Sequence, residues 1–194
     1  GESGSLDYRE KAPLSASKDM YLDDQKNIVK GLSTNGALAV GVPGTIAGLF
    51  EIHKKFGSLP IYDLFQPAID LASNGFVITK KQARSLNYFR SEILNLNDSI
   101  KLFKDRFKEG YILKNDSLAK TLRLIQTKGS DAFYSGEIAN KLSKYILDKG
   151  GILTLEDLKL YKPVWRDPIK FNYKNLNIIT MGPPSSGGIV LGQI

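Results

Sequence analysis

The 194-residue sequence contains no cysteine and a single histidine, and these two shortages narrow the chemistry that it can support. Without cysteine the chain can form neither disulfides nor thiolate metal sites, which fits a cytoplasmic protein and a disulfide-free exported bacterial protein equally well. The histidine, His53, lies in a predicted helix beside Lys54 and Lys55, with no companion for a serine–histidine–aspartate relay. We expect His53 to be an ordinary helix residue, and we predict no metal site and no cofactor.

Long apolar runs are also lacking. No segment approaches the roughly 18 apolar residues that cross a membrane, so no transmembrane segment is predicted in this chain. The opening stretch GESGS has neither the basic start nor the apolar middle of a signal peptide. The other end, residues 188–194, is apolar and stops where a helix would begin, so we expect the chain to be a fragment of a longer protein.

The net charge of +7 permits anionic partners, but its distribution argues against nucleic acid. Lysines are dispersed among acids, and the densest pairs, Lys54-Lys55 and Lys80-Lys81, are not interleaved with aromatic residues that could stack on bases. We therefore predict no nucleic-acid partner. Apolar residues make up 42% of the chain and charged residues 24%, which is typical of a folded globular domain.

The spacing of apolar residues predicts a helical middle. Its expected helices cover residues 43–56, 63–74, 79–94, 117–128, 137–149 and a short one from residue 154. Glycines follow several of them as stop signals. Thr79 and Gln82 are spaced for a capping box at the start of the third helix. Pro67 is expected to split the second helix into a short turn and a helix.

The two ends of the chain have a different period. Residues 6–8, 37–42, 168–173 and 176–181 are predicted to be extended, with Lys174-Asn175 as the turn of a hairpin, and residues 15–20 could form one helical turn. Because strands flank a helical excursion, we expect both ends to join one sheet. The prediction is an α/β (α+β) chain forming a single partial domain over residues 1–194. Its sheet-forming ends are residues 5–42 and 164–182, and its helical lobe is residues 43–161.

Arg9 is the main candidate for a binding residue. It follows a predicted strand end in the run Asp7-Tyr8-Arg9-Glu10. A guanidinium presents a planar fork of donors that can hold a carboxylate through two parallel hydrogen bonds. The residue types alone also allow a local ion pair with Asp7 or Glu10, and both interpretations stay open at this point.

The run Pro183-Pro184-Ser185-Ser186-Gly187-Gly188 could suggest an anion cradle or a nucleophilic serine. The chain has no Gly-x-Ser-x-Gly elbow and no phosphate loop with its lysine. We therefore expect a strand-to-helix turn in which prolines end the strand, a serine caps the helix and glycines allow close packing. Asp23 and Asp24 lack a spaced third ligand and are expected to be ordinary loop acids.

Taken in order, these motifs resemble the γ-glutamyltransferase (γ-glutamyltranspeptidase, glutathione hydrolase) family. Asp7-Tyr8-Arg9-Glu10 with Ala12-Pro13 is similar to the family's arginine motif. The other similar segments are GVPGTIAG at 41–48, PAIDLA at 67–72 with GF at 75–76, LAKTL at 118–122, FYSG at 133–136, GGILT at 150–154 with DL at 157–158 and Tyr161, and PPSSGG at 183–188. Each segment is short, but the ordered set covers most of the chain.

The resemblance implies part of the large subunit of an N-terminal-nucleophile hydrolase, an αββα sandwich. It implies that Arg9 grips the α-carboxylate of glutathione or another γ-glutamyl compound. Nothing in the sequence resembles the family's catalytic threonine, so no catalytic residue is assigned in this chain, and the chain alone is expected to be inactive. A small catalytic subunit from the same precursor is the implied partner, after autocatalytic cleavage of that precursor. The implied location is periplasmic or extracellular.

Two other functions are compatible with the sequence. One is a non-catalytic helical module that binds acidic ligands. The other is a related acylase, or an amidase that processes poly-γ-glutamate, since Arg9 argues only against a neutral acyl group.

Overall fold

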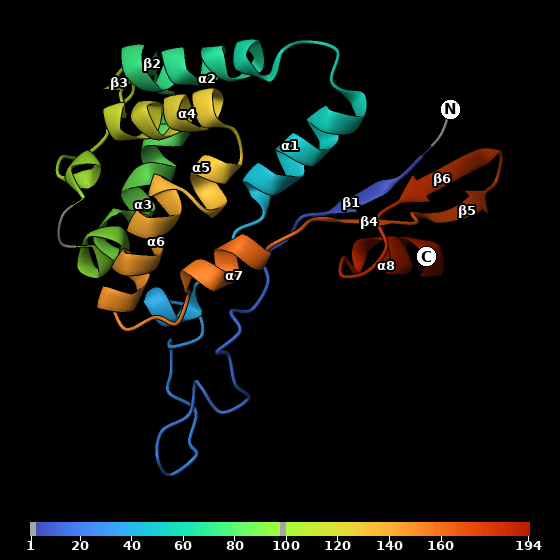
Figure 1. Cartoon of the computed structure of the whole chain (residues 1–194), viewed down its shortest axis with the longest axis horizontal. Helices are drawn as coiled ribbons and strands as arrows, with labels where there is room; N and C mark the ends of the chain where they lie inside the picture. Colours follow the sequence, from blue (N-terminus) through green and yellow to red (C-terminus); the bar gives the residue numbers. More distant parts are fainter. Residues whose placement is uncertain (1–2, 98–99) are drawn as a thin grey trace.

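The computed structural model describes residues 3–97 and 100–194, so the first two residues of the polar N-terminal stretch lie outside it. Figure 1 shows two parts. Most helices gather in a lobe. Beside it an arm holds both termini and consists of strands β1 (Ser5–Asp7), β4 (Val164–Arg166), β5 (Ile169–Tyr173) and β6 (Leu176–Thr180) with helix α8 (Gly187–Gln193). The two ends of the sequence therefore meet in space.

The middle of the chain is mainly helical, as the apolar spacing predicts. The α-helices are α1 Thr45–Phe56, α2 Ile61–Asn74, α3 Lys80–Leu96, α4 Asp116–Lys128, α5 Asp131–Tyr134, α6 Glu137–Asp148, α7 Leu155–Leu160 and α8 Gly187–Gln193. Two 3-10 turns, Ala37–Ala39 and Lys101–Phe103, complete the helical elements of the described residues. The sequence did not indicate α5 because four residues are too few to show a helical period.

Helix boundaries follow the capping signals. Thr79 Oγ1 accepts from the Gln82 N–H at 3.3 Å, and Gln82 Oε1 accepts from the Thr79 N–H at 2.8 Å, which confirms the predicted capping box. The expectation for Pro67 was wrong, because α2 runs unbroken through it. Proline removes one hydrogen bond, and the buried neighbours Phe65 and Ile69 on the same helix hold both sides of that gap in the core.

The core of the lobe consists of packed helix faces. One cluster joins α2 to α4 through Phe65, Ile69 and Ile125. A second joins α6 and α7 to the start of α1 and includes the buried residues Val42, Tyr134, Ala139, Ile146, Leu153, Leu158 and Tyr161. Two members of this second cluster bond to the segment that carries Arg9, because Val42 pairs with Lys11 and the Tyr161 hydroxyl donates to the Arg9 carbonyl oxygen.

The ends of the chain pair only in part as expected. Strand β1 (Ser5–Asp7) pairs antiparallel with β4 (Val164–Arg166), which brings the two ends together. Strands β5 (Ile169–Tyr173) and β6 (Leu176–Thr180) form the predicted hairpin, and Lys174 at its turn has a φ of 53°. The hairpin is a separate two-stranded sheet, so the expectation of one shared sheet is correct for β1 and β4 and wrong for β5 and β6.

Three local predictions need correction. Residues 37–42 are not one extended run, because Ala37–Ala39 forms a 3-10 turn and only Val42 makes a β-bridge, to Lys11. Residues 15–20 form turns without a helix. The helical middle also contains a two-residue ladder between β2 (Phe76–Val77) and β3 (Ile112–Leu113), too short to give a period-2 pattern. The loop over residues 12–36 projects away from the lobe (Figure 1).

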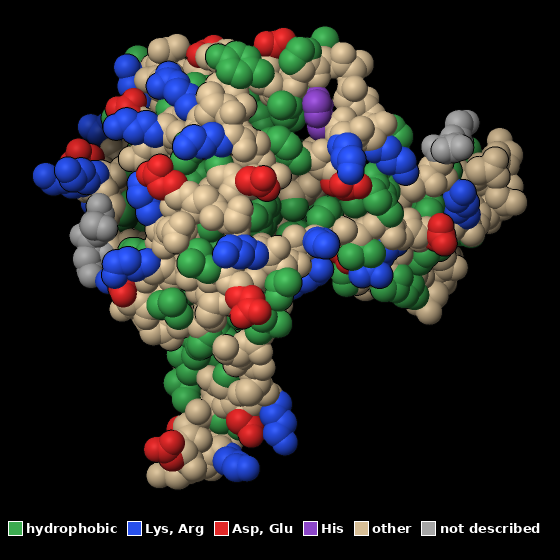
Figure 2. All heavy atoms as spheres, in the orientation of Figure 1, with side chains coloured by type: hydrophobic (Ala, Val, Ile, Leu, Met, Phe, Trp, Pro, Cys, Tyr) green, Lys and Arg blue, Asp and Glu red, His purple; other side chains and the backbone are tan. Residues whose placement is uncertain are grey.

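The surface agrees with the charge distribution read from the sequence. On the face shown in Figure 2, Lys and Arg side chains alternate with acids over the helical lobe without merging into one basic patch. Among the described residues, no helix is both long and apolar enough to cross a membrane.

Candidate functional site

Two glycines, Gly44 immediately before α1 and Gly48 within it, determine where the Arg9 segment lies. A Cβ added to Gly44 would come within 2.2 Å of the Tyr8 carbonyl oxygen, and one added to Gly48 would come within 2.3 Å of the Tyr8 ring. Only residues without a side chain allow the chain after β1 to pass this close to the helix. The backbone pairing of Lys11 with Val42, at 2.7 and 3.2 Å, fixes the other end of the segment. Gly44 and Gly48 of the 41–48 motif therefore allow the Arg9 motif to pack against the start of α1.

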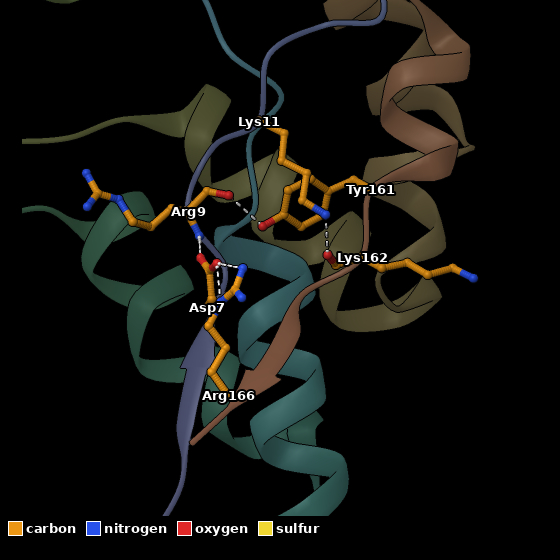
Figure 3. A network of polar contacts seen from close by, with 6 residues as sticks. All are labelled: Asp7, Arg9, Lys11, Tyr161, Lys162 and Arg166. Carbon is orange, nitrogen blue, oxygen red and sulfur yellow. Dashed lines mark hydrogen bonds and ion pairs between the residues drawn. The ribbon is translucent and has the colours of Figure 1, made fainter. Parts of the chain in front are cut away.

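The main chain of Arg9 is held on both sides. Its N–H donates to Asp7 Oδ1 at 3.2 Å, and its carbonyl oxygen accepts from the Tyr161 hydroxyl at 2.8 Å. Figure 3 shows the Tyr161 hydroxyl pointing at the Arg9 carbonyl, while the Arg9 side chain extends away from the network. The backbone is thus fixed and the guanidinium is directed outward.

Tyr161 is itself locked by its surroundings. Its ring stacks on Tyr134 at a centroid distance of 5.7 Å and an interplanar angle of 12°. Lys11 Nζ lies 5.0 Å from the centroid of the Tyr161 ring and donates to the Lys162 carbonyl at 2.9 Å. Burial, with the charges of Asp7 and Glu10 and the neighbouring Tyr134, raises the pKa of Tyr161 to about 12. The hydroxyl therefore stays protonated as a donor at any physiological pH.

The Asp7 side chain bonds to Arg166 rather than to the Arg9 side chain. Arg166, at the end of β4, places Nη2 at 2.8 Å and Nε at 2.9 Å from Asp7 Oδ2. Burial raises the pKa of Asp7, but the hydrogen bonds from Arg166 and from the Arg9 N–H outweigh it and leave the pKa below its ordinary value. Asp7 is therefore an anion whose two oxygens both have partners.

The Arg9 guanidinium, by contrast, makes no hydrogen bond or ion pair with any residue that the structure describes. The local ion pair with Asp7 or Glu10 that the residue types allowed is absent from the described part of the chain. An exposed arginine with a fixed main chain, whose guanidinium bonds to no described residue, can receive a carboxylate from outside.

Arg9 contributes to the wall of a cavity of about 620 Å³. The cavity is bounded by residues from β1, the segment after it, α1 and the β6 end, including Leu6, Tyr8, Glu10, Thr45, Ile52, Ile179 and Met181. Its volume lies in the range of small-molecule sites. A larger cavity of about 850 Å³, between residues 100 and 121, contains none of the predicted site residues. The candidate site is therefore the smaller cavity beside Arg9.

The other sequence motifs have structural roles. The PPSSGG run turns from β6 into α8, as expected, and a Cβ on Gly188 would come within 2.2 Å of the Met181 carbonyl oxygen. Ser186 precedes α8 but its side chain makes no capping bond, whereas Ser185 Oγ accepts from the Gly187 N–H at 3.4 Å. His53 Nε2 lies 2.8 Å from the Leu59 carbonyl oxygen in a loop contact. No cluster of His, Asp and Glu suited to a metal occurs within the described ranges.

The sequence motif contains the candidate Arg9 and its neighbour Asp7, but it gives no sign of the distant residues that bond to them. Tyr161 lies 152 positions and Arg166 lies 159 positions from their partners in the Arg9 segment, so no local spacing links them. Tyr161 did appear among the family-like positions, without a role. Nothing in the sequence indicated a role for Arg166 beyond its position near the start of the predicted sheet-forming end, residues 164–182.

Comparison with known proteins agrees with the site and the fold. The whole chain, residues 1–194, matches the Gamma-glutamyltranspeptidase family. It is 42% identical over 197 residues to the glutathione hydrolase proenzyme of Pseudomonas aeruginosa, covering 100% of this chain and 35% of that protein. It is 40% identical over 198 residues to the glutathione hydrolase proenzyme of Escherichia coli, covering 100% of this chain and 34% of that protein.

The fold is also similar to that of solved γ-glutamyltranspeptidase structures. The crystal structure of Helicobacter pylori γ-glutamyltranspeptidase superposes with a TM-score of 0.95 at 45% identity, covering 100% of this chain and 56% of that one. The mixed arrangement of helices and strands is therefore that of γ-glutamyltranspeptidases, which are N-terminal-nucleophile hydrolases. The chain belongs to the γ-glutamyltranspeptidase family. It spans about a third of the length of the curated relatives that it matches.

Proposed function

We propose that this chain is a large-subunit portion of an enzyme that cleaves γ-glutamyl amides such as glutathione. The acyl group would pass to water or to the amine of an amino acid or peptide. The observation that carries the proposal is the exposed Arg9 guanidinium on the wall of the 620 Å³ cavity, which bonds to none of the described residues. Membership of the family, whose relatives are named glutathione hydrolases, supports the same reaction.

In this proposal Arg9 holds the α-carboxylate of the γ-glutamyl group. Two parallel N–H···O bonds would fix the orientation of the substrate as well as its charge. The Asp7 carboxylate accepts from the Arg9 N–H and the Tyr161 hydroxyl donates to the Arg9 carbonyl oxygen, so the Arg9 main chain is already fixed and less freedom is lost when the substrate binds. The remaining donors to the substrate would come from residues outside these 194.

The chemical step would use a threonine that is not assigned within this chain. Its free α-amino group, with an ordinary pKa near 7.7–8.0, can take the proton of its own hydroxyl close to neutral pH. The hydroxyl oxygen attacks the γ-carbonyl carbon, and the amide nitrogen leaves as an amine after receiving that proton. Water or an acceptor amine then attacks the acyl-enzyme and restores the hydroxyl. The partner subunit that carries the threonine would arise by self-cleavage of the same precursor, in keeping with the word proenzyme in the names of the relatives.

The experiment is to express the protein from its complete coding sequence, and the 194-residue chain alone, and to assay both with γ-glutamyl-p-nitroanilide. We expect the complete protein to split into two chains and to release p-nitroaniline, whereas the 194-residue chain gives none beyond a mock purification. If the complete protein binds glutamate without turnover, a non-catalytic binding module is the better description. If it cleaves other acyl amides but no γ-glutamyl amide, it is an acylase.

The family resemblance also leads us to propose a periplasmic or extracellular location. Cell fractionation with antibodies against the chain tests this assignment. Recovery with cytoplasmic markers would contradict it.

A further inference from the structure

The Arg9 guanidinium lies close in the chain to a carboxylate that bonds to a different arginine, Arg166. Asp7 is only two residues from Arg9, and its Oδ1 already accepts from the Arg9 N–H. A long, flexible arginine side chain can fold back over two residues to reach such a carboxylate. Asp7 is therefore a built-in competitor for the guanidinium that the proposed function assigns to the substrate.

The Asp7 carboxylate bonds instead to Arg166. Arg166 approaches from β4, which runs antiparallel beside β1 with Ser5 opposite Arg166 and Asp7 opposite Val164. The Asp7–Arg166 contact is thus a diagonal cross-strand pair, a geometry within reach of long side chains. Nε and Nη2 of Arg166 both reach Asp7 Oδ2, and the Asp7 side chain is only 14% exposed, against 44% for Arg166. Both Asp7 oxygens are thereby occupied, one by a main-chain N–H and one by Arg166.

We propose that Arg166 is a positioning residue that occupies the Asp7 carboxylate and so keeps the Arg9 guanidinium free for a substrate carboxylate. This inference rests on the proposed function of Arg9. Without Arg166, Asp7 Oδ2 would take a new cation, either Arg9 or Lys11, whose ammonium group lies over the Tyr161 ring nearby. If Asp7 bonded to the Arg9 guanidinium, that guanidinium would no longer be available to a substrate carboxylate. Figure 3 shows the two arginines on opposite sides of Asp7.

The test compares Arg166→Gln, Asp7→Asn and the double variant in the protein expressed from its complete coding sequence. Asparagine at position 7 keeps an Oδ1 that can accept from the Arg9 N–H but carries no charge to capture Arg9. Arg123→Gln is the matched control, because Arg123 is an exposed arginine of α4 outside the site cavity. The readouts are KM and kcat for γ-glutamyl-p-nitroanilide, the inhibition constant of L-glutamate, and the midpoint of thermal unfolding.

We expect Arg166→Gln to raise KM and the glutamate inhibition constant about five- to twentyfold, with kcat changed less than about threefold. The reason is that Arg9, once bonded to Asp7, no longer makes its charge-assisted contact with the substrate α-carboxylate. Adding Asp7→Asn should recover at least about threefold of that loss, because the competitor is gone. Arg123→Gln should match the wild type. A double variant as impaired as Arg166→Gln, with unfolding midpoints falling in parallel, would show a purely structural ion pair and overturn the proposal.

The outcomes separate this inference from the proposed function. If the wild-type protein has no γ-glutamyl activity, or if Arg9→Ala does not weaken the binding of L-glutamate, the proposed function is wrong. If Arg9→Ala behaves as expected but Arg166→Gln matches the wild type, only the positioning role of Arg166 is wrong.

Discussion

Arg9 combines a fixed main chain with a side chain that has no partner in the described structure, and its neighbours account for both properties. Tyr161 and Asp7 bond to its carbonyl oxygen and N–H, while Arg166 occupies the remaining Asp7 oxygen. A binding group is effective when its supports are satisfied and its own donors are not. The residues that matter at this scale are therefore the neighbours of Arg9 as much as Arg9 itself.

Tyr161 gives a prediction about alkaline stability. Its pKa is raised from 10.0 to about 12, chiefly by burial, so the folded state favours the neutral hydroxyl. The unfolded chain ionises this tyrosine first, so its contribution is fully present below pH 10 and is lost as the pH rises toward 12. We expect Tyr161→Phe to lower the unfolding free energy by about 1 kcal/mol at pH 8, because the hydrogen bond to Arg9 is lost. The difference between wild type and variant should shrink above pH 10.

Urea unfolding of both proteins at pH 8, 10 and 11 measures that difference. Comparison with the variant cancels the titration of lysines, which occurs in both proteins. A difference that stays constant across this range would show that the Tyr161 hydroxyl ionises equally easily in the folded and unfolded states.

At the scale of elements, the position of the Arg9 segment depends on how closely the chain after β1 packs against α1. A glycine in the middle of a helix normally costs stability relative to alanine, roughly 0.5–1 kcal/mol. Gly48 reverses this rule, because its missing side chain makes room for the Tyr8 ring.

We predict that Gly48→Ala destabilises the protein by about 1–3 kcal/mol, through overpacking against Tyr8, despite the gain in helix propensity. Gly192→Ala in α8 is the matched control, since its Cβ would meet only the Phe171 ring at 3.7 Å. The control should be neutral or slightly stabilising. Thermal unfolding midpoints of the two variants measure the effect, and a Gly48→Ala variant as stable as its control would contradict the packing argument.

Asp157 has a comparable structural role at the start of α7. Its side chain accepts from the Leu14 N–H at 2.6 Å and from the Thr154 N–H at 2.7 Å, so it joins α7 to the loop after the Arg9 segment. Burial raises its pKa, but the bonds from Thr154 and Leu14 outweigh that effect and hold the pKa below 3.8. This lowered pKa means that the stabilisation is present above about pH 4 and is lost as the pH falls further.

We predict that Asp157→Ala costs about 2–4 kcal/mol at pH 7, because the Leu14 N–H, the Thr154 N–H and the Thr154 hydroxyl all lose their acceptor. Glu137→Ala is the matched control, since Glu137 pairs with Lys141 on the exposed surface and its loss should change stability by less than about 0.5 kcal/mol. Chemical unfolding at pH 7 and at pH 3 checks both values. Equal losses for the two variants at pH 7 would show that the Asp157 bonds add little.

The elements also show what the sequence could and could not predict. Capping residues such as Thr79 and stop glycines such as Gly57 act locally, so they located the helix ends correctly. The short ladder of Phe76–Val77 with Ile112–Leu113 has too few residues for a periodic signal. The 3-10 turn at Ala37–Ala39 resembles an extended apolar run in composition, and only its packing against the core cluster distinguishes the two.

At the scale of the whole molecule, the site is assembled from both ends of the chain. The Arg9 segment comes from the start, and Tyr161 and Arg166 come from far along the sequence, with the helical lobe between them (Figure 1). The sequence could indicate Arg9 because its neighbours form a recognisable motif. It could not indicate the supporting contacts, because they depend on how α7 and β4 pack beside β1.

The most direct test of the central claim is the substrate dependence of Arg9→Ala, measured in the protein expressed from its complete coding sequence. Two anilides are compared, γ-glutamyl-p-nitroanilide and its 4-aminobutyryl analogue, which lacks only the α-carboxylate. Charge-assisted hydrogen bonds contribute roughly 1.5–3 kcal/mol each, so Arg9→Ala should lower kcat/KM for the γ-glutamyl substrate about tenfold to several-hundredfold. Arg9→Lys should restore only part of this loss, because lysine keeps the charge but not the fork.

The analogue should lose little, because it offers no carboxylate to Arg9, and self-cleavage of the precursor should be largely preserved in all variants. Equal losses of kcat/KM for the two substrates would contradict the account and show that Arg9 supports the structure rather than the substrate.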